Sequence, residues 1–145
     1  MKPFQFQSVL NYRRRLEDKA RKNLMRVLRE EEEILARRKQ AAAELDELYN
    51  RQLIRRQEGV TIDHFLQTDA RKAVIREQLN LCDEQLAKVR EKVRLRRNGL
   101  LKAGQDKRAL EKLKEKQNRA YRQYLQKKEA ILLDETAILF HGREP

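Results

Sequence analysis

The sequence has few of the residues that turn or cross-link a chain. Its 145 residues include four Gly, two Pro and one Cys. Because Gly and Pro mark most turns, their scarcity predicts a small number of long elements rather than a globule. The single cysteine, Cys82, excludes an intrachain disulfide and favours a buried thiol in a reducing compartment. No stretch approaches the roughly 20 apolar residues of a membrane span, and no apolar run follows the first residues. We therefore expect no signal peptide and a soluble, cytoplasmic chain.

Charged residues and helix formers make up most of what is present. Charged side chains account for 40% of the chain and apolar ones for 39%. This composition is typical of long helices, although low hydrophobicity with high charge also occurs in disordered chains. A regular apolar spacing argues against disorder, and alternating steps of three and four residues give one. Eight of its ten positions are apolar: Leu79, Cys82, Leu86, Val89, Val93, Arg96, Leu100, Ala103, Lys107 and Leu110. This is a heptad seam, so the helix that carries it requires a partner helix.

The first part of the chain has the same spacing and a wider apolar face. Polar residues interrupt its beginning, which runs through Phe6, Leu10, Arg13, Glu17, Ala20 and Leu24. Beyond this point we expect the main stripe to be Leu28, Leu35, Ala42, Leu45 and Tyr49. A second column repeats every seven residues beside it: Val27, Ile34, Ala41 and Leu48. Two columns exceed what a two-stranded seam uses, so part of this face is expected to be available to a partner.

The only strong break in the pattern lies at Gly59. This residue is a natural C-cap for a helix that ends with Arg55 and Arg56, whose charges complement the helix dipole. Thr61 is a natural N-cap for the helix that follows. A short connection between two long helices makes them antiparallel neighbours.

The predicted fold is therefore all-α, an antiparallel two-helix coiled-coil hairpin in which helix 2 is longer than helix 1. We expect one domain over residues 1–145, with helix 1 at about 4–58, the turn at about 59–61, helix 2 at about 62–139 and a C-terminal tail at 140–145. A break at Gly99 or Gly104 would give three helices instead. Because the heptad register passes through both glycines without a slip, we expect helix 2 to be continuous.

Beyond about Leu113, helix 2 is expected to have no partner within the hairpin. This overhang carries aromatic and aliphatic side chains at Tyr121, Tyr124, Leu125, Ile131, Leu132, Ile138 and Phe140. Such groups on an unpaired helix usually mark a binding surface. A fold-back, or a dimer in which two overhangs pair, is the alternative.

Positive charge is concentrated between Lys88 and Lys128. This stretch holds sixteen Lys or Arg and four Asp or Glu, so it carries a net charge of +12, equal to that of the whole chain. A basic block of this kind favours nucleic acid, an anionic membrane or an acidic protein surface as a partner. The alternative is a basic helix face that only contacts solvent.

No set of residues suggests catalysis or metal binding. His64 and His141 are far apart in the sequence and near opposite ends of the predicted hairpin, so neither is a credible metal ligand. Asp134 and Glu135 are adjacent on a helix and point about 100° apart, so they cannot act as a carboxylate pair. A two-helix hairpin also lacks a concave, dry pocket. We therefore expect no enzyme, no cofactor and no metal site.

Two short patterns lie near the two ends of the chain. The N-terminal one consists of Phe4, Phe6, Val9, Leu10, Tyr12, Arg13 and Glu17. The C-terminal one consists of Leu110, Glu111, Leu113, Glu129, Leu133, Asp134, Glu135 and Ala137. With the chain length and the single break, they make the sequence similar to the FliJ family, the small component of the bacterial flagellar type III export apparatus.

The resemblance implies a non-enzymatic central stalk. FliJ proteins are antiparallel coiled coils that enter the hexameric export ATPase, contact the export gate in the membrane and handle export chaperones. They lie at the cytoplasmic face of the inner membrane through the export apparatus. By resemblance, the ATPase contact is expected at Phe6, Leu10, Tyr12, Arg13, Asp134 and Glu135. Two tyrosines of the overhang, Tyr121 and Tyr124, are expected to belong to the same contact. The export-gate contact is expected near Leu45, Tyr49, Ile75 and Cys82.

Two other classes of function remain open. The first is a basic coiled-coil arm that binds the nucleic-acid backbone with strong salt dependence. Against it, no aromatic residue is interleaved among the basic residues before Tyr121, so base stacking is unsupported. The second is a purely structural coiled-coil dimer. A stalk of an injectisome is a further possibility within the same class as the flagellar stalk.

Overall fold

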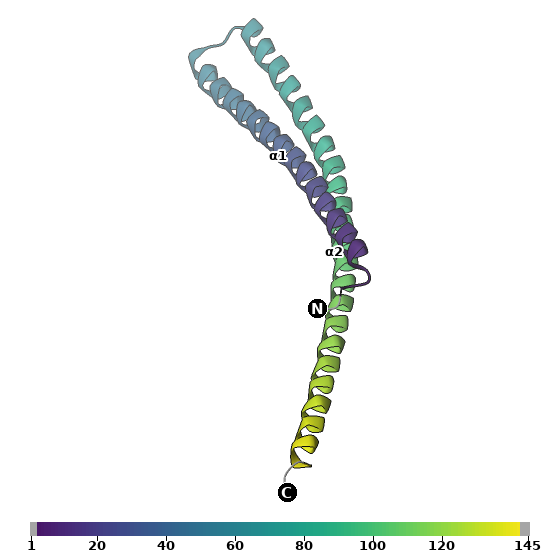
Figure 1. Ribbon diagram of the computed structural model, residues 1–145. Helices are drawn as coiled ribbons and strands as arrows, with labels where there is room; N and C mark the ends of the chain where they lie inside the picture. Colours follow the sequence, from purple (N-terminus) through teal and green to yellow (C-terminus); the bar gives the residue numbers. More distant parts are fainter. Residues whose placement is uncertain (1–2, 143–145) are drawn as a thin grey trace. The chain divides into compact units, whose positions relative to one another are not determined.

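The computed structural model describes residues 3–142, and these residues form two long helices and no strand. Helix α1 spans Gln7–Glu58 and helix α2 spans Ile62–His141. The two helices pack against each other in antiparallel directions around a turn at residues 59–61 (Figure 1). At 80 residues α2 is longer than α1, which has 52. The predicted all-α hairpin is confirmed, and α2 is continuous through both of its internal glycines.

Helix α1 begins at Gln7, three residues later than expected. A turn precedes it, in which the backbone N–H of Gln7 donates to the carbonyl of Phe4 at 3.2 Å. The Phe4 side chain is buried and meets the ring of Phe6 edge-on, with 5.9 Å between centroids. Burial of Phe4 therefore takes precedence over extending the helix toward the N-terminus. At the other end α2 continues to His141, two residues beyond the expected end.

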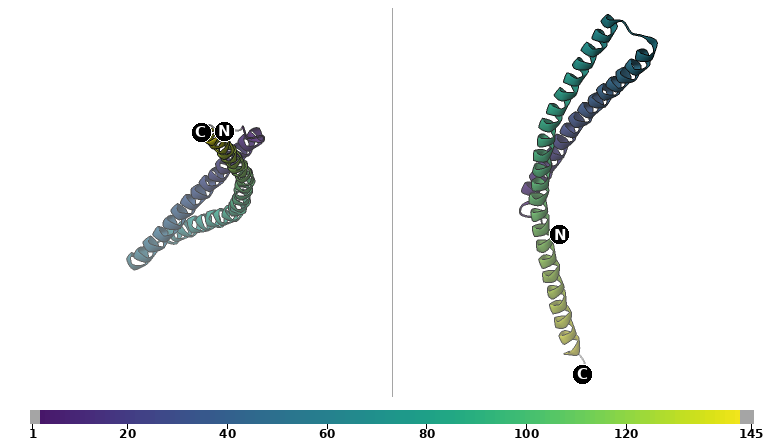
Figure 2. Two further views of the ribbon diagram at one scale, coloured as in Figure 1. Left: turned by 60° about the horizontal axis from the view of Figure 1, so that its bottom comes forward. Right: turned by 180° about the vertical axis from the view of Figure 1, so that it is seen from behind.

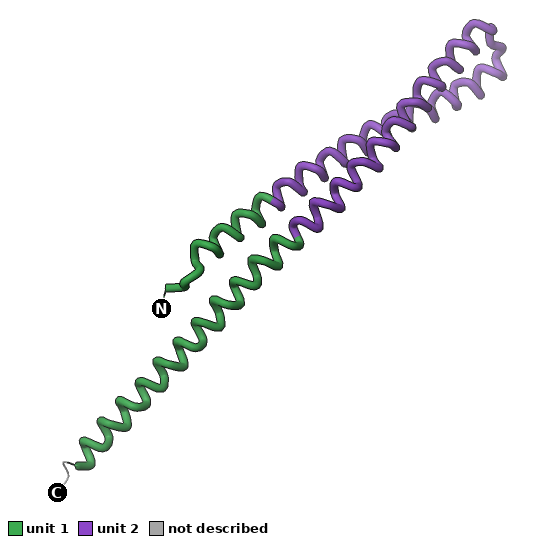
Figure 3. Tube along the Cα trace, turned by 90° about the vertical axis from the view of Figure 1, so that its right-hand side faces the viewer, with its two compact units in different colours: residues 1–19, 101–145 green, residues 20–100 purple. Residues whose placement is uncertain are grey.

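Contacts along the chain divide it into two compact units (Figure 3). Unit 1 consists of residues 1–19 and 101–145, and unit 2 consists of residues 20–100. Unit 1 therefore contains the start of α1 and the second part of α2. Unit 2 contains the rest of both helices and the turn that joins them.

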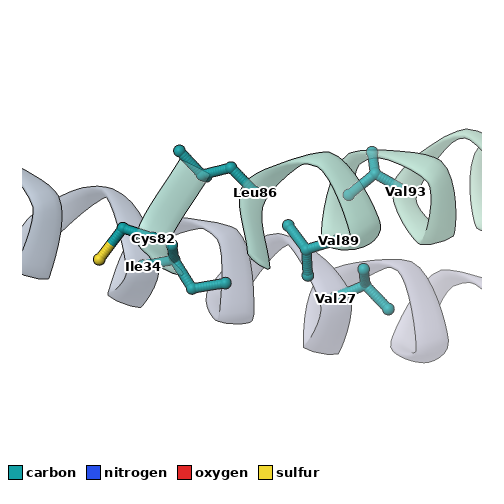
Figure 4. Packing of buried hydrophobic residues seen from close by; sticks show 6 residues of the cluster. All are labelled: Val27, Ile34, Cys82, Leu86, Val89 and Val93. Atoms are coloured by element: carbon teal, nitrogen blue, oxygen red, sulfur yellow. The ribbon is translucent and has the colours of Figure 1, made fainter. Parts of the chain in front are cut away.

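The core of unit 2 follows a heptad pattern on both helices. On α2 the buried apolar positions are Ile75, Cys82, Leu86, Val89 and Val93, and on α1 they are Val27, Ile34 and Ala41. Six of these residues form one cluster with Leu24 and Leu28 packed against it, and Figure 4 shows the six. Steps of three, four and seven place these side chains on one stripe of each helix, where the stripes of two helices can interdigitate.

Of the two apolar columns on α1, the one that contains Val27, Ile34 and Ala41 is buried more deeply. Ile34 is 7% exposed, whereas its neighbour Leu35, assigned to the main stripe, is 39% exposed. Tyr49, at the end of that stripe, is 39% exposed as well. The reason is register: from Leu24 a step of three leads to Val27 and keeps the alternation of the preceding turns, whereas a step of four to Leu28 would shift it. Leu35 and Tyr49 therefore form the accessible part of the face, whereas Leu28 packs against the core cluster and Ala42 and Leu45 are half-buried.

The seam of α2 agrees with its prediction at nine of ten positions, which are buried or half-buried. The exception is Arg96, which is exposed. A long basic side chain can carry its charge out of a seam and into water, which explains this position.

The turn is built as the sequence predicts. Gly59 has a φ of 85°, in the left-handed region that suits glycine at a helix C-terminus. Thr61 caps α2, because its Oγ1 accepts a hydrogen bond from the backbone N–H of His64 at 3.4 Å. Arg55 and Arg56 occupy the last turn of α1. In Figure 1 and in the right-hand view of Figure 2, the ribbons of the two helices of unit 2 move apart as they approach this turn.

Candidate partner-binding surfaces

In unit 1, the start of α1 is held to α2 by one buried leucine and several ionic contacts. Leu10 is fully buried. Arg13 pairs with Asp106 at 3.4 Å, and Glu17 pairs with Lys107 at 2.9 Å. Glu17 is itself buried. In unit 1, charged side chains therefore lie between the two helices, whereas in unit 2 aliphatic side chains fill this space.

The four N-terminal residues expected at the ATPase contact fall into two classes. Leu10 is buried and Arg13 is half-buried in its ion pair, so both hold the helices together. Phe6 and Tyr12 are 41% and 51% exposed and reach the surface of unit 1. Only these two are accessible to a partner.

Pairing of the two helices in unit 1 extends further along α2 than expected. The side-chain amide of Gln117 donates to the carbonyl of Pro3 at 3.5 Å, and Lys114 donates to Gln7 at 2.9 Å. Tyr121 is still half-buried. The overhang therefore begins at about residue 122 rather than after Leu113. The reason is that Pro3, which precedes α1, still contacts α2 at Gln117.

From residue 122 to residue 142 every side chain of α2 is exposed. We call this segment the overhang. Its large apolar side chains are between 39% and 70% exposed: Tyr124, Leu125, Ile131, Leu132, Leu133, Ile138, Leu139 and Phe140. The ring of Tyr124 stacks on that of Tyr121, with centroids 6.5 Å apart. Asp134 and Glu135 are exposed on the same segment. A series of exposed apolar residues of this size is typical of a binding surface.

Charge changes sign within the overhang. Lys127 and Lys128 end the basic block. Between Glu129 and Gly142 there are three acidic residues and no Lys or Arg. The last part of the overhang therefore presents apolar and acidic groups.

The four residues expected at the export gate are all in unit 2, and two of them are buried. Ile75 and Cys82 lie in the core, and Leu45 is half-buried. Tyr49 is the accessible one: its hydroxyl receives a hydrogen bond from Arg76, and the Lys72 ammonium lies 4.1 Å from the centre of its ring. A surface contact at this level would therefore use Tyr49, while Ile75 and Cys82 support the helices beneath it.

The basic block is mostly a solvent-facing surface with some local pairing. Arg94 donates to Glu91 at 2.5 Å, and this hydrogen bond lowers the pKa of the Glu91 carboxyl below its ordinary value of 4.5. Arg119 pairs with Glu115 one turn away. Many other cations of the block, such as Arg90 and Lys102, are exposed and form no ion pair within the described residues.

A cleft of about 370 Å³ lies beside the turn in unit 2. Its apolar lining comes from Leu48, Val60 and Phe65, and its basic lining from Arg51, Arg55 and Arg56. Sequence reasoning assigned Leu48 to the second apolar column and Arg55 and Arg56 to the end of helix 1, and it missed the cleft. The available signal was the Arg55–Arg56 pair in the last turn of α1, followed by apolar residues at Val60 and Phe65.

Metal chemistry and membrane insertion have no support in residues 3–142. Within this range no group of three or more His, Cys, Asp or Glu side chains is placed to hold a metal ion. Neither α1 nor α2, over the same range, contains a segment long and apolar enough to cross a bilayer.

Comparison with known proteins gives one result. The profile of the family described as Flagellar FliJ protein matches residues 1–145, which is the whole chain. No curated protein and no solved structure matches it. The family match, the two packed helices and the longer second helix agree, and the chain belongs to the FliJ family of flagellar export proteins.

Proposed function

We propose that this protein is a non-enzymatic central stalk that engages the hexameric flagellar export ATPase through the overhang of α2. The family match supports a role in flagellar export. The observation that carries the proposal is the exposure of every side chain from residue 122 to residue 142, including eight large apolar ones. Groups of this kind gain free energy when a partner covers them, at about 25 cal/mol per Å² of apolar surface.

The start of α1 adds further exposed surface to unit 1, beside that of the overhang. Phe6 and Tyr12 add exposed aromatic surface, and Asp134 and Glu135 add negative charge on the overhang. Leu10 keeps the N-terminal part of α1 attached to α2. In this proposal the ATPase contacts the overhang and the two aromatic residues, while the buried leucine acts only through the fold.

The proposal also includes the export gate and export chaperones as partners. The gate contact is assigned to the surface around Tyr49, supported from within by Ile75 and Cys82. Such contacts would hold the protein at the cytoplasmic face of the inner membrane through the export apparatus. The wider apolar face of α1 in unit 2, exposed at Leu35, is a surface for a chaperone.

The test is ATP hydrolysis by the flagellar export ATPase of the same organism, with and without this protein. We expect the full chain to stimulate hydrolysis and a chain truncated after Arg122 to give no stimulation, because it lacks the overhang. The truncated chain should keep its remaining helices, since the contacts of Gln7 and Pro3 with α2 all precede residue 122. Circular dichroism checks this. A truncated chain that stimulates as well as the full one would refute the proposal.

A matched pair of point variants separates the overhang from general surface effects. Leu132 and Leu101 are 54% and 57% exposed and both lie on α2 in unit 1. Leu132→Asp should raise the concentration for half-maximal stimulation by about tenfold or more, because a buried leucine contributes about 1.5–3 kcal/mol. Leu101→Asp should leave it unchanged. Equal effects of the two would argue against a contact at the overhang.

A second function is favoured by one observation, the exposed cations of the basic block. A coiled-coil arm that binds nucleic acid would show affinity falling steeply with salt, in proportion to the phosphates contacted. Tight, salt-sensitive binding to RNA or DNA, with no effect on the ATPase, would favour this function. Light scattering distinguishes the third possibility, since a monomer at micromolar concentration excludes the structural dimer.

A further inference from the structure

The cleft beside the turn has the size of a ligand site and a mixed lining. Its volume of about 370 Å³ falls within the range of small-molecule and side-chain pockets. Leu48 and Val60 are half-buried, and Phe65 is 39% exposed, so apolar surface lines it without being covered. Both helices and the turn contribute to its lining, with Leu48 from α1, Val60 from the turn and Phe65 from α2.

The charges that line this cleft have one sign. Arg51, Arg55 and Arg56 line it, and no Asp or Glu does. Arg51 pairs with Glu47 at 2.5 Å, but Arg55 and Arg56 form no ion pair within residues 3–142. A smaller neighbouring cleft shares Arg56 and adds the Lys72 side chain, again with no acidic residue in its lining.

Other clefts of unit 2 have a different character. One is lined by Arg37 and Glu44, and another by Glu30 together with Arg26, Lys92 and Arg96. Each of these two linings therefore includes an acidic residue beside the basic ones, and in the second Glu30 pairs with Lys92 at 3.9 Å. The cleft at the turn differs from both because no acidic residue lines it and its arginines surround apolar surface.

One polar atom of the lining has no partner. His64 lines the cleft, and its Nε2 is buried without a hydrogen bond. A buried polar atom in this state is costly, and a ligand that supplies a hydrogen bond removes that cost. The hydroxyl of the neighbouring Thr68 is already used, because it donates to the His64 carbonyl at 3.0 Å.

We propose that the cleft beside the turn binds an acidic peptide segment of a partner protein, in which carboxylates flank an apolar side chain. The apolar side chain occupies the space between Leu48, Val60 and Phe65. The flanking carboxylates pair with Arg55 and Arg56. A carboxylate is the group that a guanidinium binds with best geometry, by two parallel hydrogen bonds. This site is in unit 2, uses none of the overhang and does not depend on the proposed ATPase contact.

Fluorescence anisotropy with the full chain tests the site directly. The probe is a fluorescein-labelled peptide in which a leucine–phenylalanine pair lies between two pairs of glutamates. We expect saturable binding. A peptide with glutamine at the four glutamate positions should bind about tenfold or more weakly, and so should one with serine in place of the two apolar residues. Equal binding of the three peptides would overturn the proposal, as would no saturable binding of the first.

Two variants locate the site, and one serves as their control. Arg55→Glu combined with Arg56→Glu should weaken binding about tenfold or more, and Val60→Trp should do the same by filling the cleft. Arg96→Glu combined with Arg97→Glu makes the same change in net charge elsewhere in unit 2 and should leave binding unchanged. Equal loss in the control would show non-specific attraction and overturn the proposal.

The site has one competing occupant, the acidic and apolar end of α2 from a second copy of the chain. Light scattering of the full chain without peptide decides this point. Concentration-dependent association that Val60→Trp abolishes, together with no peptide binding, would assign the cleft to self-association and overturn the peptide proposal. A monomer that binds the peptide supports it.

Discussion

Replacement of Ile34 and of its neighbour Leu35 by alanine tests which column of α1 faces α2. Each change removes three carbon atoms, and each buried carbon contributes about 0.8 kcal/mol. Ile34 is 7% exposed, so nearly the whole contribution is lost and a cavity remains; we expect a cost of about 2–3 kcal/mol. Leu35 is 39% exposed and its space refills with water, so no cavity remains and the cost should be about 1.5 kcal/mol or less. Alanine is a better helix former than either residue, which offsets a few tenths of a kcal/mol in both variants.

Urea unfolding followed by circular dichroism at 222 nm gives the two free energies of unfolding. Hydrogen exchange of the amides between residues 27 and 41 provides a local measurement, because parts of a helical hairpin open separately. Ile34→Ala should speed exchange in this segment more than Leu35→Ala does. If Leu35→Ala costs as much as Ile34→Ala or more, the register described for unit 2 is wrong.

Three further changes probe the turn, the ionic seam and the basic block. Gly59→Ala should destabilise the hairpin by about 1 kcal/mol in urea unfolding, because a φ of 85° strains any residue with a Cβ although open space surrounds it; an unchanged midpoint would contradict this. Lys107→Met should lower the stability of unit 1 by about 1–3 kcal/mol, because it removes a charged partner of the buried Glu17. Hydrogen exchange near the start of α1 measures this loss, and adding Glu17→Gln should recover part of it. Titration of Glu91 by NMR should give a pKa below 4.5 that rises toward 4.5 in Arg94→Gln. Because the pKa of Glu91 is lower in the folded state, the hydrogen bond from Arg94 stabilises the fold fully above pH 4.5. This stabilisation disappears as the pH falls through the lowered pKa.

The fold was predictable because its signals are local and periodic. The turn needs only Gly59 and Thr61, and the seam of α2 needs only steps of three and four, so both follow from neighbouring residues. The sequence did not show which of the two adjacent columns on α1 is buried more deeply, because both are apolar. Composition cannot show whether Ile34 or Leu35 is the more deeply buried residue. The register of the preceding helical turns does show it, and it favours Ile34.

The partner surfaces were less predictable, because exposure depends on what the other helix covers. Leu10, Ile75 and Cys82 match the expected contact positions, yet all three are buried between the helices. The overhang was expected and starts later, since Pro3 extends the pairing by contacting Gln117. The cleft at the turn is lined by residues of both helices and of the turn, a combination that no local pattern encodes.

The ionic seam of unit 1 gives the two units different heat capacities of opening. Separating the start of α1 from α2 mainly rehydrates the charges of Arg13, Asp106, Glu17 and Lys107, and exposure of polar groups lowers the heat capacity. Opening unit 2 exposes the aliphatic cluster around Val89, and exposure of apolar groups raises it. Apolar contacts weaken on cooling, so cold acts first on the aliphatic seam of unit 2 and leaves the ionic seam of unit 1 comparatively unchanged.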